Sequence, residues 1–351
     1  MGRAGLNRKT ALATATLTLA AEAPDIDVFS RFGGSAFGFN HHRGFTHSFL
    51  GVPLVAAAVV ALMYGIWRLR GRRTGNPNLP PRWALLFAYA CLAGLSHILL
   101  DFTNNYGVRP FWPFSERWYS WDIIFIVEPV LLVVMALGLM LPALFSLINE
   151  EIGARNKGPN AAPAGRLAAA LALIGVVAYW GLSDFEHRRA VAALQSRSYQ
   201  GADPVRVSAY PYMTNPFRWY SVAETPNFFA TMNVNSRSFV SAVPEVDPEG
   251  QMRIRFKPEE TAVTLAAKKT YLGRVYLSWA QYPITETEDL AHDLVNNSHA
   301  AYVVRFRDLR YDYPGSVARG SLGARVFLNR DLQIVDEQFG SPRANAAARS
   351  K

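Results

Sequence analysis

Charged residues and cysteine are scarce in this sequence. Only 18% of its 351 residues are charged and 50% are hydrophobic, so a disordered chain is excluded. The single cysteine excludes a disulfide framework and a cysteine-based zinc site. The motifs GxSxG, HExxH and GxGxxG and the phosphate-binding loop are also absent. Any catalytic site must therefore follow another sequence pattern.

The few charges are unevenly distributed along the chain. They make up about 13% of residues 1–182 and about 23% of residues 183–351. This split predicts a membrane domain over residues 1–183 and a soluble domain over residues 184–351. The net charge of +9 does not indicate a nucleic-acid partner, because five of the cations lie in one short loop between apolar segments.

The first half contains long apolar segments. A membrane-spanning helix needs about 20 mainly apolar residues. Four stretches approach or exceed that length: Phe49–Trp67, Trp83–Leu100, Ile123–Ile148 and Leu167–Leu182. The shorter, Thr-rich segment Thr10–Ala23 indicates a half-inserted or re-entrant helix. We expect an α-helical membrane domain of about four long spans plus this short N-terminal helix, with a buried soluble bundle as the alternative.

Basic residues between the spans predict the orientation. The cations of the two loops concerned are Arg68, Arg70, Arg72, Arg73 and Arg82, followed by Arg155, Lys157 and Arg166. The positive-inside rule places both loops in the cytoplasm. Residues 24–48, residues 101–122 and the C-terminal domain are then expected on the periplasmic face of a bacterial inner membrane.

Acidic and histidine side chains collect where the apolar segments end. Ionisable groups at a membrane edge are costly and mark functional sites. The candidates are Asp25, Asp27, His42, His47, His97, Asp101, Asp122 and Glu128. His97 and Asp101 are four residues apart, which puts them on one helical face. Imidazole with carboxylate suits zinc, and also manganese or iron.

Each of these residues also has a structural interpretation. His97 and Asp101 could form an ordinary ion pair, and Asp122 could cap a helix. The aromatic loop from Phe111 to Trp121 is typical of the membrane interface. Because the orientation puts all the candidates on one face, a shared metal or catalytic site is favoured. We expect His42, His47, His97 and Asp101 as ligands, with Asp25 and Asp27 as further ligands or supporting groups. Asp122 or Glu128 is expected to act as a base or to orient a ligand histidine.

Three segments resemble a known family. They are Pro24–Asp27, His42–Ser48 and Ser96–Asp101, and the resemblance continues through Asn105–Gly107, Pro113–Phe114, Asp122 and Glu128–Pro129. The sequence resembles the bacterial inner-membrane proteins known as membrane-bound metal-dependent hydrolases, which include an SOS-regulated member. The similarity covers roughly residues 4–185, and such proteins usually carry a further Thr-His segment ahead of Arg3.

The resemblance implies a divalent metal, a hydrolytic reaction and a lipid or phosphoester substrate. It leaves a second class open: a non-catalytic transport or scaffold protein whose periplasmic domain binds a partner.

The second half is expected to be an α+β domain with a mainly antiparallel sheet. A charged helix is predicted from Asp184 to about Ser198, and a second over Glu286–Asn296. β-branched and aromatic runs predict the strands Ser238–Val243, Met252–Phe256, Tyr271–Trp279, Ala301–Leu309 and Ala324–Leu328, with Ile334 extending the last hairpin.

Overall fold

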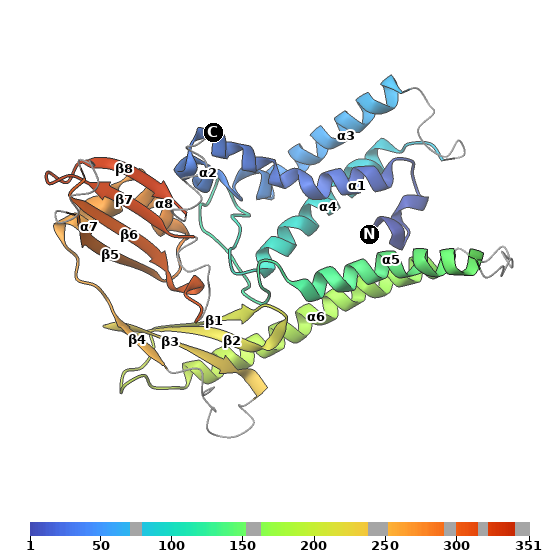
Figure 1. Ribbon diagram of the computed structural model, residues 1–351. Helices are drawn as coiled ribbons and strands as arrows, with labels where there is room; N and C mark the ends of the chain where they lie inside the picture. The colour runs from blue at the N-terminus through green and yellow to red at the C-terminus, as the bar shows by residue number, and fades with distance from the viewer. Residues whose placement is uncertain (71–78, 152–162, 238–251, 291–299, 315–321, 341–351) are drawn as a thin grey trace.

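The chain divides into a helical half and a half built on two β-sheets (Figure 1). The computed structural model describes residues 1–70, 79–151, 163–237, 252–290, 300–314 and 322–340. The helical elements of the first half are η1 (Gly2–Ala4), η2 (Leu6–Arg8), α1 (Ala13–Glu22), η3 (Ala23–Gly33), α2 (Ser35–His41), η4 (Phe45–His47), α3 (Gly51–Leu69), α4 (Trp83–Thr103), α5 (Pro129–Glu151) and α6 (Pro163–Gln195).

Helices α1, α3 and α4 pack together around small side chains. Ala13 and Ala20 of α1 meet Ala56 of α3 and Ala90 and Ala93 of α4 in one buried cluster. Such residues let helix backbones approach closely, as in membrane bundles. Helices α5 and α6 form a second antiparallel pair beside them (Figure 1).

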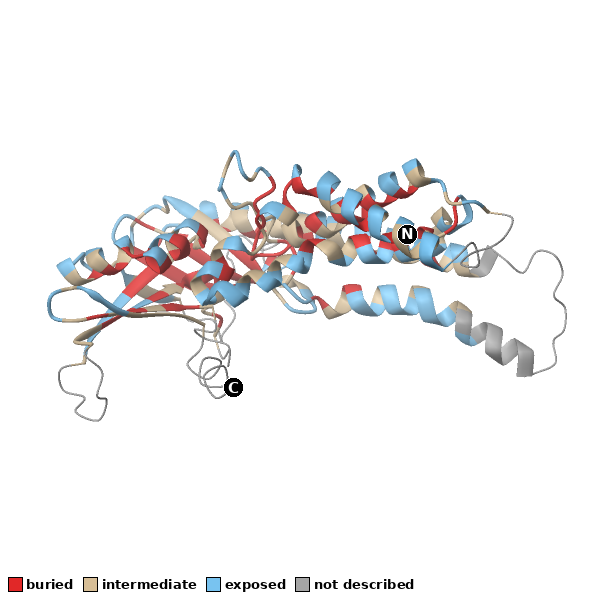
Figure 2. Cartoon of the chain, turned by 90° about the horizontal axis from the view of Figure 1, so that it is seen from above, coloured by how far each residue is buried: buried red, intermediate tan, exposed pale blue. Residues whose placement is uncertain are grey.

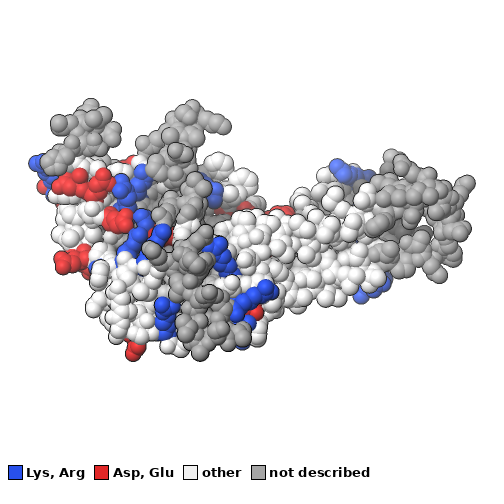
Figure 3. Space-filling model, turned by 60° about the horizontal axis from the view of Figure 1, so that its bottom comes forward, with Lys and Arg blue, Asp and Glu red and all other residues white. Residues whose placement is uncertain are grey.

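Three described helices are long and apolar enough to cross a membrane: α3, α4 and α6 from Gly165. Only 17–33% of their apolar windows is buried, so most of the apolar surface faces outward (Figure 2). Figure 3 shows few charges on this part of the molecule. A soluble bundle would bury these faces, and the exposure instead supports membrane helices. In α5 the described apolar stretch, Pro129–Pro142, is shorter than a span.

The charged helix predicted from Asp184 continues the last apolar segment. Helix α6 runs without interruption from Pro163 to Gln195. Its last turns leave the apolar region and pack Ala190 and Leu194 against Trp219 of the first sheet. One continuous helix therefore forms both the last apolar segment and the charged helix predicted from Asp184.

The second half contains two four-stranded antiparallel sheets in simple meander order. The first sheet comprises β1 (Arg206–Tyr212), β2 (Asn215–Glu224), β3 (Phe228–Asn235) and β4 (Arg253–Phe256). The second comprises β5 (Pro283–Asp289), β6 (Tyr302–Asp308), β7 (Ala324–Leu328) and β8 (Ile334–Phe339), covered by α7 (Ala262–Lys269) and α8 (Tyr271–Trp279), with η7 (Leu309–Tyr311) after β6. The antiparallel α+β class and the strands β4, β6, β7 and β8 are confirmed.

The prediction of a strand over Tyr271–Trp279 was wrong. The segment is helix α8, and the Thr270 side chain caps it by accepting a hydrogen bond from the Gly273 N–H. Its buried residues Leu272, Val275, Tyr276 and Trp279 repeat at three and four residues, which is a helical period. The aromatic content of the segment had suggested a strand, but the spacing of its buried residues is that of a helix.

The helix predicted over Glu286–Asn296 was also wrong in its first part. Residues Glu286–Asp289 belong to β5, where Glu286 pairs with Arg305 of β6. Residues 291–296 and the predicted strand Ser238–Val243 lie outside the described residues. Strands β1 to β3 were not predicted at all.

Elements beside the second sheet bind the loop that follows α4 in the helical half. Trp279 Nε1 donates to the Tyr106 carbonyl (3.1 Å), and Arg310 Nη1 donates to the Asn105 carbonyl (2.9 Å). Phe39 of α2 stacks on Phe339 of β8 with ring centroids 4.1 Å apart. The loop that follows α4 is thus fixed from both halves of the chain.

Candidate metal centre

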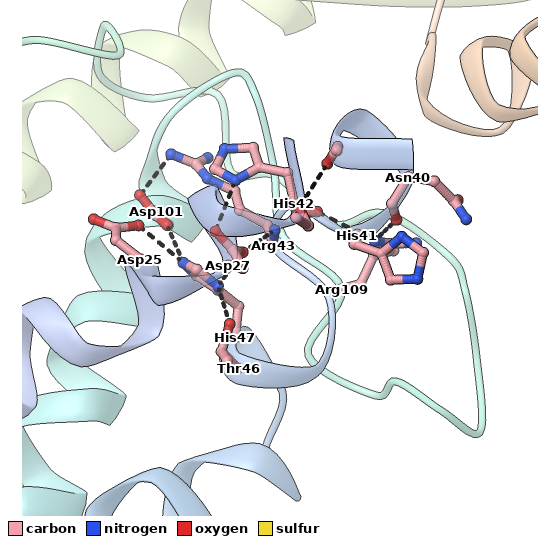
Figure 4. A network of polar contacts seen from close by, with 12 residues as sticks. Asp25, Asp27, Asn40, His41, His42, Arg43, Thr46, His47, Asp101 and Arg109 are labelled. Atoms are coloured by element: carbon pink, nitrogen blue, oxygen red, sulfur yellow. Dashed lines mark hydrogen bonds and ion pairs between the residues drawn. The ribbon is translucent and has the colours of Figure 1, made fainter. Parts of the chain in front are cut away.

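Two short elements and one long helix converge at the end of the bundle nearest the sheets. η3 supplies Asp25 and Asp27, η4 supplies His47, and the last turns of α4 supply His97 and Asp101. Close backbone approach makes this possible, because a Cβ on Gly51 would lie 1.8 Å from the Phe45 carbonyl oxygen. Figure 4 shows Asp25, Asp27, His47 and Asp101 pointing toward one another.

Two imidazole nitrogens and two carboxylate oxygens lie close together, with each oxygen near both nitrogens. His47 Nε2 lies 3.2 Å from His97 Nε2 and 3.4 Å from Asp25 Oδ1. Asp101 Oδ2 lies 3.4 Å from His47 Nε2 and 3.5 Å from His97 Nε2, and Asp25 Oδ1 lies 3.5 Å from His97 Nε2. Asp25, His47 and His97 by themselves form a group of ligand atoms that could hold a metal ion.

These separations fit a cation better than a hydrogen-bond network. A single proton on His47 Nε2 cannot serve an imidazole nitrogen and two carboxylates together, and Asp101 Oδ2 is buried without a hydrogen-bond partner. Metal–nitrogen and metal–oxygen bonds of about 2.0–2.1 Å in a tetrahedron place neighbouring donors about 3.3 Å apart. The residues present therefore fit a divalent ion such as zinc.

The electrostatics of the cluster also favour positive charge. Burial by itself lowers the pKa of His47, but the carboxylates of Asp101, Asp25 and Asp27 outweigh it and raise the pKa to about 10. His47 and His97 hold the pKa of Asp25 well below its usual range. Three carboxylates around a fully buried imidazole thus create a strongly negative potential.

Asp27 and Arg43 support the donor atoms from behind. Asp27 Oδ2 lies 3.2 Å from His47 Nδ1 and accepts the Arg43 backbone N–H at 2.6 Å. Arg43 Nη2 donates to Asp101 Oδ1 at 2.8 Å, so that Oδ2 is left for the cluster. A partner on the far nitrogen of a ligand histidine fixes its orientation and tautomer.

His42 lies next to the cluster and outside the four-atom group. Its Nδ1 is 3.1 Å from Asp27 Oδ1, and its ring meets Tyr106 edge-on. In Figure 4 it contacts Asp27 while His41 lies to the side near Arg109. The described contacts of His42 are those of a supporting residue, and its role as a ligand stays a prediction.

Asp122 and Glu128 each contact a neighbour in the first half of the chain and a residue of the second half. Asp122 hydrogen-bonds to Ser120 and Gln281, whereas Glu128 accepts the backbone N–H groups of Val130 and Thr214 at 3.2 and 3.1 Å. Glu128 therefore joins the start of α5 to the β1–β2 turn. The acid–base role predicted for these two residues is untested.

Asp122 predicts a pH dependence of stability. Burial raises its pKa from 3.8 to about 6, and the nearby Arg310 only partly opposes this. Between these two values the folded chain retains a proton that the unfolded chain has lost, so stability falls as the pH rises through this window. We expect Asp122→Asn to remove that fall, with a gain of at most about 3 kcal/mol at pH 7. Thermal unfolding at pH 4 and pH 7 checks this, since equal behaviour of both proteins at pH 7 contradicts it.

Two arginines of the site, the largely buried Arg43 and the buried Arg109, were missed from the sequence. Arg43 binds Asp101 and also donates to the Gly107 carbonyl at 3.0 Å, in a left-handed conformation with φ 52°. Arg109 donates to the carbonyls of Asn40 and His42. The position of Arg43 between two histidines was the available signal, because an arginine there has carboxylates within reach.

Comparisons with known proteins identify the family of the chain. A family model described as YdjM inner membrane protein matches residues 1–190. The chain is 28% identical over 112 residues to the "Uncharacterized protein YfhP" of Bacillus subtilis (strain 168), covering 32% of this chain and 31% of that protein. It thus spans about a third of this relative's length, and no solved structure matches. The family model covers more than half of the chain, including every residue of the metal-donor group, and the chain belongs to the YdjM inner membrane protein family.

Proposed function

We propose that this protein is a membrane-bound, metal-dependent hydrolase whose site lies at the outer membrane–water interface. The observation that carries the proposal is the convergence of two imidazole nitrogens and two carboxylate oxygens. His47 Nε2 and His97 Nε2 lie 3.2 Å apart, and each lies 3.4–3.5 Å from Asp25 Oδ1 and from Asp101 Oδ2. A divalent ion bound there, with zinc favoured by the donor set and manganese or iron as alternatives, would polarise an ester oxygen and acidify water.

The residues around this centre have different roles, because some position the donor atoms and one lies on the open side. Asp27 keeps the Nδ1 proton of His47 in place, and Arg43 holds one oxygen of Asp101. His47 is fully buried, whereas the Asp25 side chain is 53% exposed. Asp25 therefore marks the open side, where a substrate would approach. A lipid or phosphoester is the substrate class we propose, because an interfacial position presents such groups to the site.

The test combines metal content with hydrolysis. Protein purified in mild detergent should contain a bound divalent metal and lose it with a chelator. It should hydrolyse members of a panel of phospholipids and soluble phosphoesters as purified, lose this activity with the metal, and regain it when the metal is added back. His41→Ala is the matched control, because His41 is exposed and contacts Phe37 rather than the cluster. Metal binding without hydrolysis across the panel would favour a transport or scaffold protein.

Asp27→Asn is expected to weaken metal binding without unfolding the chain. The amide keeps the size of the side chain but loses the charge that orients His47 and pairs with His42. Loss of such a supporting partner lowers metal affinity roughly 10–100-fold. Competition with a fluorescent chelator measures the change, and unaltered affinity would show that Asp27 does not position His47.

A further inference from the structure

The segment η3 presents an exposed apolar ridge beside the metal-donor group. η3 is a 3₁₀ helix of 11 residues, Ala23–Gly33. Side chains three residues apart eclipse one another in such a helix. Ile26, Phe29 and Phe32 follow this spacing and are 58%, 61% and 88% exposed. The rings of Phe29 and Phe32 stack with centroids 6.0 Å apart, so these three side chains form a continuous ridge.

The other faces of η3 have different characters. Asp27 and Ser30, on a second face, turn inward, to His47 and to the Gly38 carbonyl. Asp25, Val28 and Arg31 form a third face, which is exposed and carries both charges. The segment is thus amphipathic, and its polar faces hold the site while the 26/29/32 ridge has no apolar neighbour covering it within the described chain.

The surroundings of the ridge indicate what covers it. η3 packs against α1, α3 and α4 at their site-facing ends. Phe49 and Leu50, directly before α3, and Leu54 within it are exposed at the same end, and α4 exposes Leu99 and Leu100 there. Because α3 and α4 are membrane-spanning candidates, the ridge continues an apolar surface that meets lipid. Amphipathic helices of this kind lie with the apolar face about 5–10 Å into the headgroup–acyl boundary.

We propose that the Ile26/Phe29/Phe32 ridge inserts into the leaflet at the site-facing end of α3 and α4 and fixes η3 to the bilayer. Since η3 carries Asp25 and Asp27, the insertion holds one donor and one supporting carboxylate at the level of the lipid headgroups. That consequence for the site rests on the proposed function, whereas the insertion itself does not.

Spin labels at single cysteines test the depth of the ridge in the full chain. On a Cys91→Ser background, labels are placed at Phe32→Cys and Ile26→Cys in phosphatidylethanolamine–phosphatidylglycerol nanodiscs. For each spin label, its collision rate with oxygen, which is enriched in lipid, is compared with its collision rate with a water-soluble nickel chelate. Leu54→Cys on α3 is the lipid-facing reference. Phe256→Cys on β4 is the matched water-facing control, because Phe256 is also an exposed phenylalanine, at 69%.

We expect oxygen-to-nickel collision ratios at positions 26 and 32 near that at Leu54→Cys and well above that at Phe256→Cys. A ratio equal to that of Phe256→Cys overturns the proposal. Protection from both reagents with spin–spin broadening also overturns it, because a second copy of the chain would then cover the ridge. Metal content is measured on the same samples, so that loss of the proposed metal function and failure of insertion are read independently.

Discussion

Replacing His47 or His97 with alanine is expected to abolish both the bound metal and the hydrolysis. His47 is fully buried, and both of its ring nitrogens are engaged, Nε2 in the donor group and Nδ1 with Asp27. Removing either imidazole takes away one nitrogen donor and leaves Asp25 and Asp101 with one histidine in place of two to balance their negative charge, and of these two carboxylates Arg43 is paired with Asp101. The loss should exceed the roughly 10–100-fold expected for a supporting residue such as Asp27. Elemental analysis and the hydrolysis assay measure the two effects.

The control for this prediction is a histidine from the same stretch of sequence. His41→Ala should keep its metal and its activity, because His41 is exposed. Retained secondary structure by circular dichroism separates loss of a ligand from loss of the fold. If His97→Ala bound metal as tightly as the unaltered protein, the four-atom site would be wrong.

Arg310→Ala is expected to cost about 3–5 kcal/mol of stability, the usual effect of breaking a buried ion pair. Arg310 is 1% exposed, and its Nε donates to Asp308 Oδ2 at 2.8 Å. Its other nitrogens donate to the carbonyls of Asn105 and Trp279 at 2.9 and 3.0 Å. The substitution would leave Asp308 charged and buried and would release the loop after α4. Thermal unfolding in detergent, followed by circular dichroism, measures the loss.

Arg307→Ala is the matched control for Arg310. Its guanidinium is 31% exposed and pairs with Glu286 and Asp312 at the surface, so we expect a change of about 0–1 kcal/mol. The double change Asp308→Leu with Arg310→Met should cost less than Arg310→Ala, because no unpaired charge is then buried. Equal destabilisation by Arg307→Ala and Arg310→Ala would contradict the anchoring role of Arg310.

Part of the fold could be read from local patterns. Long apolar runs predicted α3 and α4, because a helix in lipid must be apolar over its whole length. The strand over Ala324–Leu328 was predicted to the residue. The strand predicted at Tyr271–Trp279 failed because β propensity depends on context, and capping by Thr270 with helical spacing prevailed.

Part of the candidate site could also be predicted from the sequence. Histidines and carboxylates are rare in the membrane half, and their positions at the ends of apolar runs predicted that His47, His97, Asp25 and Asp101 would meet. Nothing in the spacing separated these four donors from His42, whose nitrogen turns to Asp27 instead. That distinction depends on the direction of side chains within a few ångströms.

The sequence by itself determined that this chain is a membrane protein with a polar site at one end of its helices. Polar and charged side chains are costly in lipid, so a membrane helix is apolar along its length and its ionisable residues collect at its ends. Only the tertiary structure decided which side chains lie close enough to bind one ion. It also decided that Arg43 and Arg310 connect this group to the second sheet and that η3 exposes an apolar ridge. These features arise from contacts between segments far apart in the chain, and local patterns do not encode such contacts.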